Sequence, residues 1–566
     1  MILMLAQKFR KEVVTALYKA TSLQLAEIEL LLENPPKGIA ADVAFPCFSL
    51  AKQQRKPPAV IAQELAESLE PRGLIAKVET QGPYINFTAN WIRLGQMLLN
   101  DAVGDRFPCF SSTNRTVLVE FPGPNTNKPL HLGHLRIGIL GTAIANILRF
   151  TGNNVKRVDI INDRGIHISK SMLAYKKFGN KKYPDKKPDH FVGDYYVRYA
   201  QELDGKEGVE EALRRMLVEW EAGSPSVRKL WKQMNEWTLR GFRDTYRRMG
   251  WTIDKAYRES EHYLEGKKIV QAALKKGIFH KEGNGNIVAD LEMDSLGKKV
   301  VLRGDGTSIY ITQDLALAKK RYTDFKMDEM IYVVGSEQKH AFQSLFRIFD
   351  QLNFPFARHC THVSVGMISL PSGRMKSREG IVADADTLID KVKELAEKEI
   401  RVRGKIPHLQ IAKTAEKIAV GAIVYFILSY DAGRDFLYNP EASLAFEGNT
   451  GPYLQYAHSR ASSILRKAPL GKGHAKYLVE DKERAILRHL LSFPASLELA
   501  ARDLRPHHLA AWTHELASLF NDFYQTHHVI GSGEGVQEAR LLLTRAVQKT
   551  LAKSMELLGV PVLGRM

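Results

Sequence analysis

The chain has 566 residues, of which 44% are hydrophobic and 25% are charged. This length exceeds what one hydrophobic core serves and predicts about three or four domains, which excludes a single small binding module. The composition is that of an ordinary folded protein and excludes wholesale disorder. The 81 lysines and arginines outnumber the 63 aspartates and glutamates by 18. This basic excess favours polyanionic partners such as nucleic acid or phosphate-rich ligands, with a merely basic, well-solvated protein as the alternative.

The three cysteines of the chain, Cys47, Cys109 and Cys360, lie far apart and form no Cys-x-x-Cys pair. This usage is typical of a reducing compartment and favours neither a disulfide framework nor a structural metal. The longest apolar stretch, residues 418–430, is well short of the roughly 20 residues that span a bilayer, so we expect no membrane segment. The N-terminus has helical periodicity and lacks a cleavage signal. The expected location is the cytoplasm.

The pattern along the chain predicts an α/β protein with three parts. Residues 1–110 read as a small α+β domain, because helical segments precede two alternating strand segments. Residues 111–390 read as a doubly wound α/β domain. Residues 391–566 have almost no strand signal and several helix-period stretches, which predicts an all-α helical bundle.

The middle part begins with a strand at residues 117–119, a loop rich in Pro, Gly and Asn, and a helix over residues 133–150. A second strand follows at residues 155–161, so this is a strand, loop, helix, strand unit of the Rossmann type. Further strands are predicted at residues 300–302 and 330–334, with an insertion around residues 170–290 interrupting the sheet.

Chemistry is concentrated where the first of these strands ends and its helix begins, with His131, Gly133 and His134 at the helix start. In open α/β sheets ligands bind at this edge, and a helix N-terminus offers unpaired N–H groups and partial positive charge. Gly133 lets a nucleotide approach the backbone, and two imidazoles three residues apart reach one side of the loop. This arrangement suits a triphosphate.

Two alternatives for this loop are a zinc pair and a plain polar loop. The zinc alternative lacks an obvious third and fourth ligand nearby. The chain also contains no Gly-x-x-x-x-Gly-Lys-Ser/Thr sequence, so ATP is not bound by a P-loop.

Residues 131–134, His-Leu-Gly-His, resemble the HIGH signature of class I aminoacyl-tRNA synthetases, and the sequence around them resembles arginyl-tRNA synthetase. The similarity covers nearly the whole chain and includes residues 162–165, 305–314, 334–338 and 446–460. It implies a class I Rossmann-type catalytic domain between an N-terminal α+β domain and a C-terminal anticodon-binding helical bundle. It also implies an arginine–tRNA ligase, which makes arginyl-adenylate from L-arginine and ATP and transfers the arginyl group to the 3′-terminal adenosine of tRNA(Arg).

The N-terminal part is similar to the additional domain of arginyl enzymes at residues 38–52 and 82–87. In that family this domain contacts the corner of the tRNA where the D-loop lies. The resemblance therefore implies tRNA contacts at Phe45 and Asn86. The residues by themselves indicate only a small α+β domain with turns.

An arginine site needs carboxylates and planar acceptors, because a guanidinium has five donors and no acceptor. The resemblance places five residues in this site: Glu120, Asn125, Tyr310, Asp314 and Gln338. Glu120 and Asp314 are expected to bind the cationic groups. Without the resemblance, Asp314 would be interpreted as a helix cap and Glu120 as a surface carboxylate at a strand end.

The second class I signature, KMSKS, is replaced here by Gly-Arg-Met-Lys-Ser-Arg-Glu-Gly at residues 373–380. Its usual second lysine corresponds to Ser377, and the resemblance implies that Lys128 supplies the missing charge, assisted by Lys376 and Arg378. A solvated basic loop is the alternative. By the same resemblance, the expected catalytic residues are Lys128, His131, Gly133, His134, Lys376 and Arg378. The expected ATP contacts are His131, Gly133, His134, Gly335, Glu337, Met375 and Lys376.

In the helical part, stacking and charged groups alternate at Tyr453, Tyr456, His458 and Arg460. Unpaired anticodon bases and their phosphates require such groups, so we expect tRNA contacts here. Core packing of the tyrosines is the alternative, equally so for Tyr453. Four later aromatic residues are expected to pack the bundle: Trp512, Phe520, Phe523 and Tyr524.

The resemblance further implies that Mg²⁺ accompanies ATP, that the partners are tRNA(Arg), L-arginine and ATP without a membrane, and that the protein is a monomer. One alternative is another class I synthetase or a small-molecule nucleotidyltransferase, which the N-terminal domain and the acidic, tyrosine-containing pocket oppose. The other is a non-catalytic tRNA-binding paralogue. Such a paralogue would be expected to have lost His131, His134 or Lys128, and all three are present.

Overall fold

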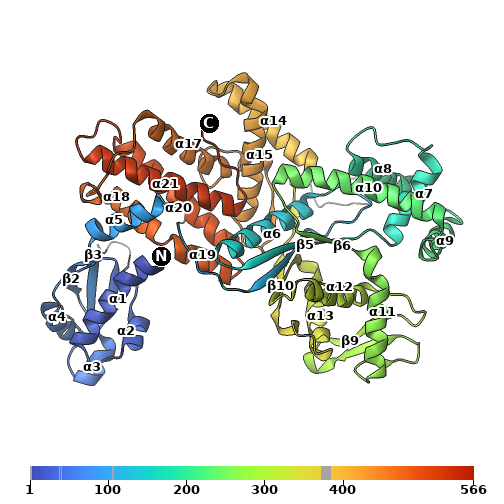
Figure 1. Cartoon of the computed structure of the whole chain (residues 1–566), viewed down its shortest axis with the longest axis horizontal. Helices are drawn as coiled ribbons and strands as arrows, with labels where there is room; N and C mark the ends of the chain where they lie inside the picture. Colours follow the sequence, from blue (N-terminus) through green and yellow to red (C-terminus); the bar gives the residue numbers. More distant parts are fainter. Residues whose placement is uncertain (1–2, 37–38, 40, 105–106, 371–383) are drawn as a thin grey trace.

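The computed structural model describes residues 3–36, 39, 41–104, 107–370 and 384–566. The N-terminal domain forms one end of the molecule (Figure 1). Its three-stranded antiparallel sheet has the order β1-β3-β2, which confirms the predicted α+β domain. Its elements are α1 (Leu3–Ala20), α2 (Leu25–Leu31), β1 (Val43–Pro46), α3 (Phe48–Gln54), α4 (Pro58–Ser68), β2 (Ile75–Gln81), β3 (Tyr84–Ala89) and α5 (Trp91–Ala102).

The central sheet has five parallel strands in the order β11-β10-β4-β5-β6. The strands are β4 (Thr116–Glu120), β5 (Asn154–Ile161), β6 (Lys255–Arg258), β10 (Glu329–Gly335) and β11 (Cys360–Val365). The chain runs from β4 to β5 on one side and later returns to β10 on the other side of β4. The strand order therefore reverses at β4, which makes the end of this strand the expected ligand crevice. The predicted Rossmann-type sheet is confirmed.

Helices cover both faces of this sheet, as the pleat of β4 requires. Val117 and Val119 are buried on the side of α6 (Leu132–Phe150), whereas Leu118 is buried with α12 (Tyr310–Phe325) and α13 (Lys339–Gln351). The helix α6 is seated very closely, since a Cβ on Gly138 would come within 2.2 Å of the ring of Trp251. The same holds at Gly141, where the distance to Phe121 would be 2.3 Å. This close packing fixes the N-terminus of α6 at the crevice.

The insertion after β5 is helical and consists of α7 (Ile166–Phe178), α8 (Pro188–Glu202), α9 (Val209–Glu221) and α10 (Pro225–Met249). After it, β6 returns to the main sheet as an edge strand that the sequence did not predict, because four residues with little apolar character carry a weak strand signal. Next come α11 (Glu259–Lys275) and a small antiparallel sheet of β7 (His280–Lys281), β8 (Ile287–Leu291) and β9 (Gly297–Leu302). The predicted strand at residues 300–302 exists, but it belongs to this small sheet and not to the central one.

The C-terminal part is a helical bundle, as predicted, and Figure 1 shows it in gold to red beside the N-terminal domain and α6. Its helices are α14 (Ala385–Arg403), α15 (Ile411–Leu428), α16 (Pro440–Ser443), α17 (Gly451–Lys467), α18 (Asp481–Leu491), α19 (Phe493–Arg502), α20 (Pro506–Thr526) and α21 (Val536–Leu558). A two-residue strand pair, β12 (Ile368–Ser369) with β13 (Phe436–Leu437), joins the bundle to the part that contains the central sheet. Among the residues described, no helix combines the length and apolar character needed to cross a bilayer.

Candidate active site

The two histidines of the His-Leu-Gly-His segment cap the first turn of α6. The Gly133 N–H donates to Nδ1 of His131 at 3.2 Å, and the His131 N–H donates to Nδ1 of His134 at 3.2 Å. Because each Nδ1 accepts a hydrogen bond, the proton of each neutral ring is on Nε2. The ring centroids are 3.8 Å apart. A Cβ on Gly133 would lie 3.0 Å from the His131 ring, so glycine is what allows this close approach.

The environment of these rings keeps them uncharged. Burial lowers the pKa of His131 to about 3, with a smaller contribution from the neighbouring Lys128. Burial, His131 and Lys128 together hold the pKa of His134 well below its ordinary value, and burial lowers the pKa of Lys128 as well. The site therefore presents two Nε2–H donors beside one lysine at a helix N-terminus. These groups suit an anionic phosphate.

The loop between β4 and α6 is fastened to the end of β5. The Gly123 N–H donates to Oδ1 of Asp159 at 3.0 Å, and the Thr126 N–H donates to the carbonyl of Asn162 at 3.1 Å. The Tyr246 hydroxyl donates to the other oxygen of Asp159 at 2.9 Å. Burial raises the pKa of Asp159 to about 8, although these two hydrogen bonds act in the opposite direction. The sequence analysis did not identify Asp159 and Tyr246, whose hydrogen bonds hold the loop in place.

A group of carboxylates lies on the opposite face of β4 from α6. Glu120, at the end of β4, is buried and forms an ion pair with Arg321 of α12, which is 1% exposed. Burial and the Glu120 carboxylate raise the pKa of Asp314 to about 7. Glu259, at the start of α11, also has a pKa raised to about 7 by burial. The structure thus brings Glu120 and Asp314 together and adds Glu259 and Arg321, which the sequence did not identify.

Two half-buried carboxyl groups with raised pKa values are suited to a cationic ligand, because a bound cation would favour their ionised forms. The remaining predicted arginine ligands lie on the rim. Asn125 follows β4 and Gln338 follows β10, both exposed at the carboxyl edge of the sheet. Tyr310 is the first residue of α12, which leads into β10, so it lies at the same edge and is 76% exposed.

Two of the predicted ATP contacts also lie at this edge. Gly335 is the last residue of β10, and a Cβ there would come within 2.3 Å of the Glu337 carboxylate. Three other predicted residues lie outside the described residues: Met375, Lys376 and Arg378. The chain that follows them lies at the crevice. The Ala385 N–H donates to the carbonyl of Leu130 at 2.9 Å, and the backbone of Asp384 forms an isolated antiparallel β-bridge with that of His131.

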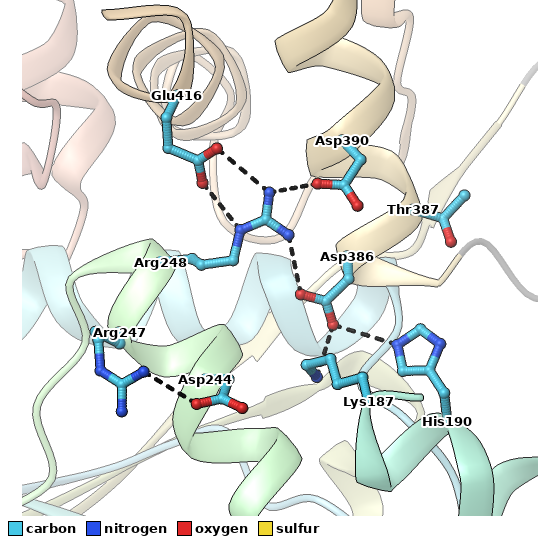
Figure 2. Close-up of a pocket in the computed structure, with 9 residues that line it drawn as sticks. All are labelled: Lys187, His190, Asp244, Arg247, Arg248, Asp386, Thr387, Asp390 and Glu416. Atoms are coloured by element: carbon cyan, nitrogen blue, oxygen red, sulfur yellow. Dashed lines mark hydrogen bonds and ion pairs between the residues drawn. The ribbon is translucent and has the colours of Figure 1, made fainter. Parts of the chain in front are cut away.

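A cavity of about 540 Å³ lies between the insertion and the start of the helical bundle (Figure 2). Arg248 of α10 crosses it and bonds Asp386 and Asp390 of α14 at 3.2 and 2.6 Å. The same guanidinium bonds Glu416 of α15 at 2.9 Å. These ion pairs join α10 to α14 and α15. They lie close to Asp384, whose backbone forms the β-bridge with His131.

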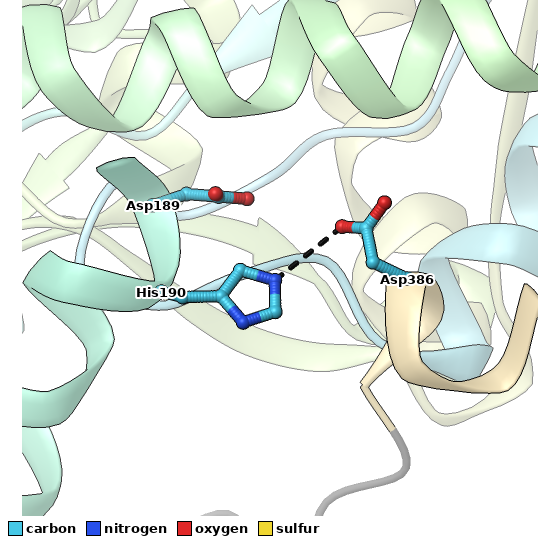
Figure 3. A group of neighbouring side chains, drawn as sticks. All are labelled: Asp189, His190 and Asp386. Atoms are coloured by element: carbon cyan, nitrogen blue, oxygen red, sulfur yellow. Dashed lines mark hydrogen bonds and ion pairs between the residues drawn. The ribbon is translucent and has the colours of Figure 1, made fainter. Parts of the chain in front are cut away.

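Asp189, His190 and Asp386 are the one group in the described part of the chain whose ligand atoms are close enough for a metal ion (Figure 3). The ammonium group of Lys187 lies 2.7 Å from Asp189 and 2.8 Å from Asp386. Hydrogen bonding to Asp386 raises the pKa of His190. Burial raises the pKa of Asp386, but His190 and Lys187 hold it well below its ordinary value. The lysine supplies the positive charge here, so the donor set does not fit a resident metal.

The structure places the two predicted tRNA residues of the N-terminal domain inside that domain. Phe45 is 0% exposed, and its side chain is part of the domain core. Asn86 is also buried, on the paired strand β3. Their contacts with tRNA stay predictions.

In the bundle, half-buried Tyr456 and Arg460 and exposed Tyr524 form an aromatic and cationic cluster. The Arg460 guanidinium lies 4.6 Å from the ring centroid of Tyr456 and 4.7 Å from that of Tyr524, and it donates to Asn521 at 2.5 Å. Tyr524 is 42% exposed, so the prediction that it packs the bundle was wrong. The three other aromatic residues with that prediction are buried: Trp512, Phe520 and Phe523.

The two other predicted tRNA residues of the bundle lie further inside. His458 is buried, and its Nδ1 bonds the Leu563 carbonyl at 2.8 Å, so it supports the C-terminal segment and is not a surface residue. Tyr453 is half-buried beside His514, with ring centroids 5.4 Å apart.

We predict that His131 and His134 remain neutral, with the proton on Nε2, from pH 8 down to pH 5. Their depressed pKa values and the N–H donors at Nδ1 both oppose protonation. Long-range ¹H–¹⁵N spectra of protein labelled in histidine, assigned with His131→Gln and His134→Gln, test this directly. A midpoint near 6.5 for either ring would contradict it.

Three family models match the chain. They are "tRNA synthetases class I (R), catalytic domain" at residues 94–439, "DALR anticodon binding domain" at residues 454–566 and "Arginyl tRNA synthetase N terminal domain" at residues 7–89. Two similar proteins are named arginine–tRNA ligase, from Treponema denticola (41% identical, 98% of both chains) and Bacteroides thetaiotaomicron (39%, 96% of both).

Solved structures agree with this grouping. The arginyl-tRNA synthetase of Thermus thermophilus superposes with a TM-score of 0.78 at 27% identity, over 94% of this chain and 96% of that one. The enzyme from Plasmodium falciparum shares the fold at the same TM-score, with 19% identity over 99% of both chains. The crevice of α6, the helical bundle and these matches together show that the chain belongs to the arginyl-tRNA synthetase family of class I.

Proposed function

We propose that the chain is an arginine–tRNA ligase that activates L-arginine with ATP, releasing diphosphate, and then transfers the arginyl group to the 3′-terminal adenosine of tRNA(Arg), releasing AMP. One observation carries this function. Neutral imidazole donors and Lys128 lie on one side of the end of β4, and the carboxylates of Glu120 and Asp314 lie on the other. A phosphate and a guanidinium can therefore meet at one strand end.

In the first step, an oxygen of the arginine carboxylate attacks the α-phosphorus of ATP, and diphosphate leaves. No covalent enzyme intermediate is needed, so the protein positions the reactants and stabilises the charge that develops on the leaving group. The Nε2–H groups of His131 and His134 and the first N–H groups of α6 are the donors for this charge. Lys128 adds a cation, and Lys376 and Arg378 are the further candidates.

Other ATP contacts are proposed at Gly133, Gly335, Glu337 and Met375. Gly133 and Gly335 support this site indirectly, because the lack of a side chain at each lets the His131 ring and the Glu337 carboxylate pack closely against the backbone. Mg²⁺ accompanies ATP as part of the substrate and is bound by its phosphate oxygens. The donors and cations of the chain itself position the phosphates of this substrate.

For the amino acid, Glu120 and Asp314 bind the positive groups of arginine, and Asn125, Tyr310 and Gln338 supply acceptors at the rim. The raised pKa of Asp314 supports this role, because a guanidinium would restore the ionised carboxylate. Lysine is disfavoured because a compact ammonium leaves part of a bidentate site unpaired. Each buried group left unpaired costs about 1–3 kcal/mol.

The tRNA is proposed to contact residues 1–110 through its corner and the bundle, residues 391–566, through its anticodon, while residues 111–390 carry the chemistry. The cluster of Tyr456, Arg460 and Tyr524 supports the anticodon contact, since aromatic rings and a guanidinium stack on unpaired bases and Tyr524 is exposed. Tyr453 lies one turn earlier on α17. We propose that the protein works as a monomer in the cytoplasm.

We expect ATP–pyrophosphate exchange with arginine and with no other of the twenty amino acids, measured with and without tRNA. Lys128→Met should lower the rate at least tenfold because it removes the cation beside the two imidazoles. Exchange driven by another amino acid would refute the assignment of the pocket. Binding of tRNA without any exchange would identify a non-catalytic paralogue.

Arginine affinity should rise as the pH increases through 7. Asp314 has a pKa of about 7 in the free protein, so at pH 6 only about a tenth of it is ionised, and arginine binds about tenfold more weakly than at pH 8. Calorimetry in buffers of different ionisation enthalpy should show proton release on binding at pH 7. Asp314→Asn should weaken binding and flatten the pH dependence. The exposed Asp522→Asn on α20 is the matched control, and equal slopes in both variants would disprove the role.

Loss of the aromatic rings of the cluster of Tyr456, Arg460 and Tyr524 should weaken tRNA binding. Tyr456→Leu and Tyr524→Leu should each cost about 1–3 kcal/mol, the usual contribution of one stacked base. Filter binding at fixed salt measures the change, with Tyr477→Leu as a matched control, because Tyr477 is similarly exposed elsewhere in the bundle. The contact is disproved when the dissociation constants of all three variants equal that of the unchanged protein.

A further inference from the structure

Arg136, in the second turn of α6, is a buried cation that forms no hydrogen bond to a carboxylate among the described residues, although the nearby charges of Asp435 and Asp431 favour its charged form. It is 1% exposed, and its guanidinium carbon lies 4.5 Å above the ring of Phe436. Its guanidinium donates only to backbone carbonyls: Nη1 to Gly366 (2.6 Å) and Met367 (3.1 Å), and Nη2 to Asp431 (3.3 Å), Ala432 (2.9 Å) and Arg434 (2.6 Å). Burying a charge costs free energy, which indicates that this side chain does more than fill space in the core.

The five carbonyls belong to two separate segments that lie against each other and are also joined by backbone hydrogen bonds, such as the Gly366 N–H to the Ala432 carbonyl at 2.9 Å. Gly366 and Met367 lie between β11 and β12, whereas residues 431–434 connect α15 to β13. The two backbones are in close contact, since a Cβ on Gly366 would lie 2.7 Å from the carbonyl carbon of Arg434. The Met367 N–H also donates to Asp435 at 2.7 Å. Arg136 thus fastens α6 to the junction between the central sheet and the helical bundle.

The same helix holds the chain at a second place. The carbonyl of Leu130, just before α6, accepts the Ala385 N–H at 2.9 Å, and His131 pairs with Asp384 at the start of α14. The first two turns of α6 therefore carry the two imidazoles, the contact to α14 and the contact to β12 and β13. Arg136 follows His134 by two residues on this rigid element.

We propose that Arg136 is a positioning residue for adenylate formation. By binding the carbonyls of residues 366–367 and 431–434, it fixes the position of the imidazole pair of α6 relative to the neighbouring segments of the site. Its role rests on the proposed function, because the readout is the activation of arginine. It does not touch the arginine pocket, since the carboxylates lie on the opposite face of β4. Misplacement by about 1 Å costs up to about a hundredfold in rate.

Two substitutions separate positioning from general stability. Arg136→Lys keeps the charge but has one ammonium for two sets of carbonyls, and Arg136→Met removes the donors. The matched control is Arg157→Lys. Arg157 is also a buried arginine bound to α6, but it reaches Asn146 at the far half of that helix, at 2.6 Å. Thermal unfolding of each variant shows whether it is folded.

Exchange with saturating arginine should fall at least tenfold in turnover for Arg136→Lys and further for Arg136→Met, while calorimetry gives an arginine dissociation constant within twofold of the unchanged protein. Arg157→Lys should lose similar thermal stability but keep its turnover within twofold. The proposal is overturned when Arg136→Lys keeps full turnover. It is also overturned when turnover and arginine affinity fall together in both lysine variants. Absence of arginine-dependent exchange in the unchanged protein, both with and without tRNA, would instead refute the proposed function.

Discussion

The first turn of α6 depends on two imidazole rings that cap it through their Nδ1 atoms. This single arrangement decides the tautomer, because a nitrogen that accepts a backbone N–H cannot also carry a proton. It also decides the charge, because protonating either ring would break a cap inside a buried environment next to Lys128. The close packing of Gly138 and Gly141 then fixes the whole helix on the sheet. Rigid neutral donors at a strand end are the form of electrostatic preorganisation that phosphate chemistry uses.

The pleat of β4 separates two chemically opposite halves of the crevice. Its alternate residues face α6 and α12, so the strand that ends in Glu120 sends its carboxylate to the α12 side, while the following loop returns to the α6 side. Cations and N–H donors therefore gather on one side and carboxylates on the other. A ligand with an anionic end and a cationic end is oriented by this separation before any specific contact is considered.

Local patterns predicted the parts of this site that are continuous in sequence. The strands at residues 117–119 and 155–161 and the helix of His131 follow from apolar periodicity and from a loop rich in Pro, Gly and Asn, so they could be predicted. The strand β6 could not, because four residues between two helices carry little periodicity. Glu259 and Arg321 were missed for a different reason. Each is far from Glu120 in sequence, and only the packing of α11 and α12 on the sheet brings them near.

The burial of single residues could not be predicted from the sequence. Phe45 and His458 are both buried, one in a sheet core and one against the C-terminal segment, and neither motif nor spacing indicates this. Tyr524 is exposed although packing was expected, since helical spacing alone does not say which side of α20 faces a neighbour.

Contacts of the central sheet, the insertion and the helical bundle meet at the start of α14. Asp384 pairs with the HIGH-like segment, and two residues later Asp386 accepts from Lys187 of the insertion and from Arg248 of α10. Arg248 also bonds Glu416 of α15, and the chain after α15 forms the segment whose carbonyls Arg136 binds. A displacement of the bundle relative to the sheet would therefore have to break the ion pairs of Arg248 on one side of α6 or the carbonyl contacts of Arg136 on the other. The geometry of the imidazole pair is thus set by the bundle and the insertion together, although neither supplies an atom to it.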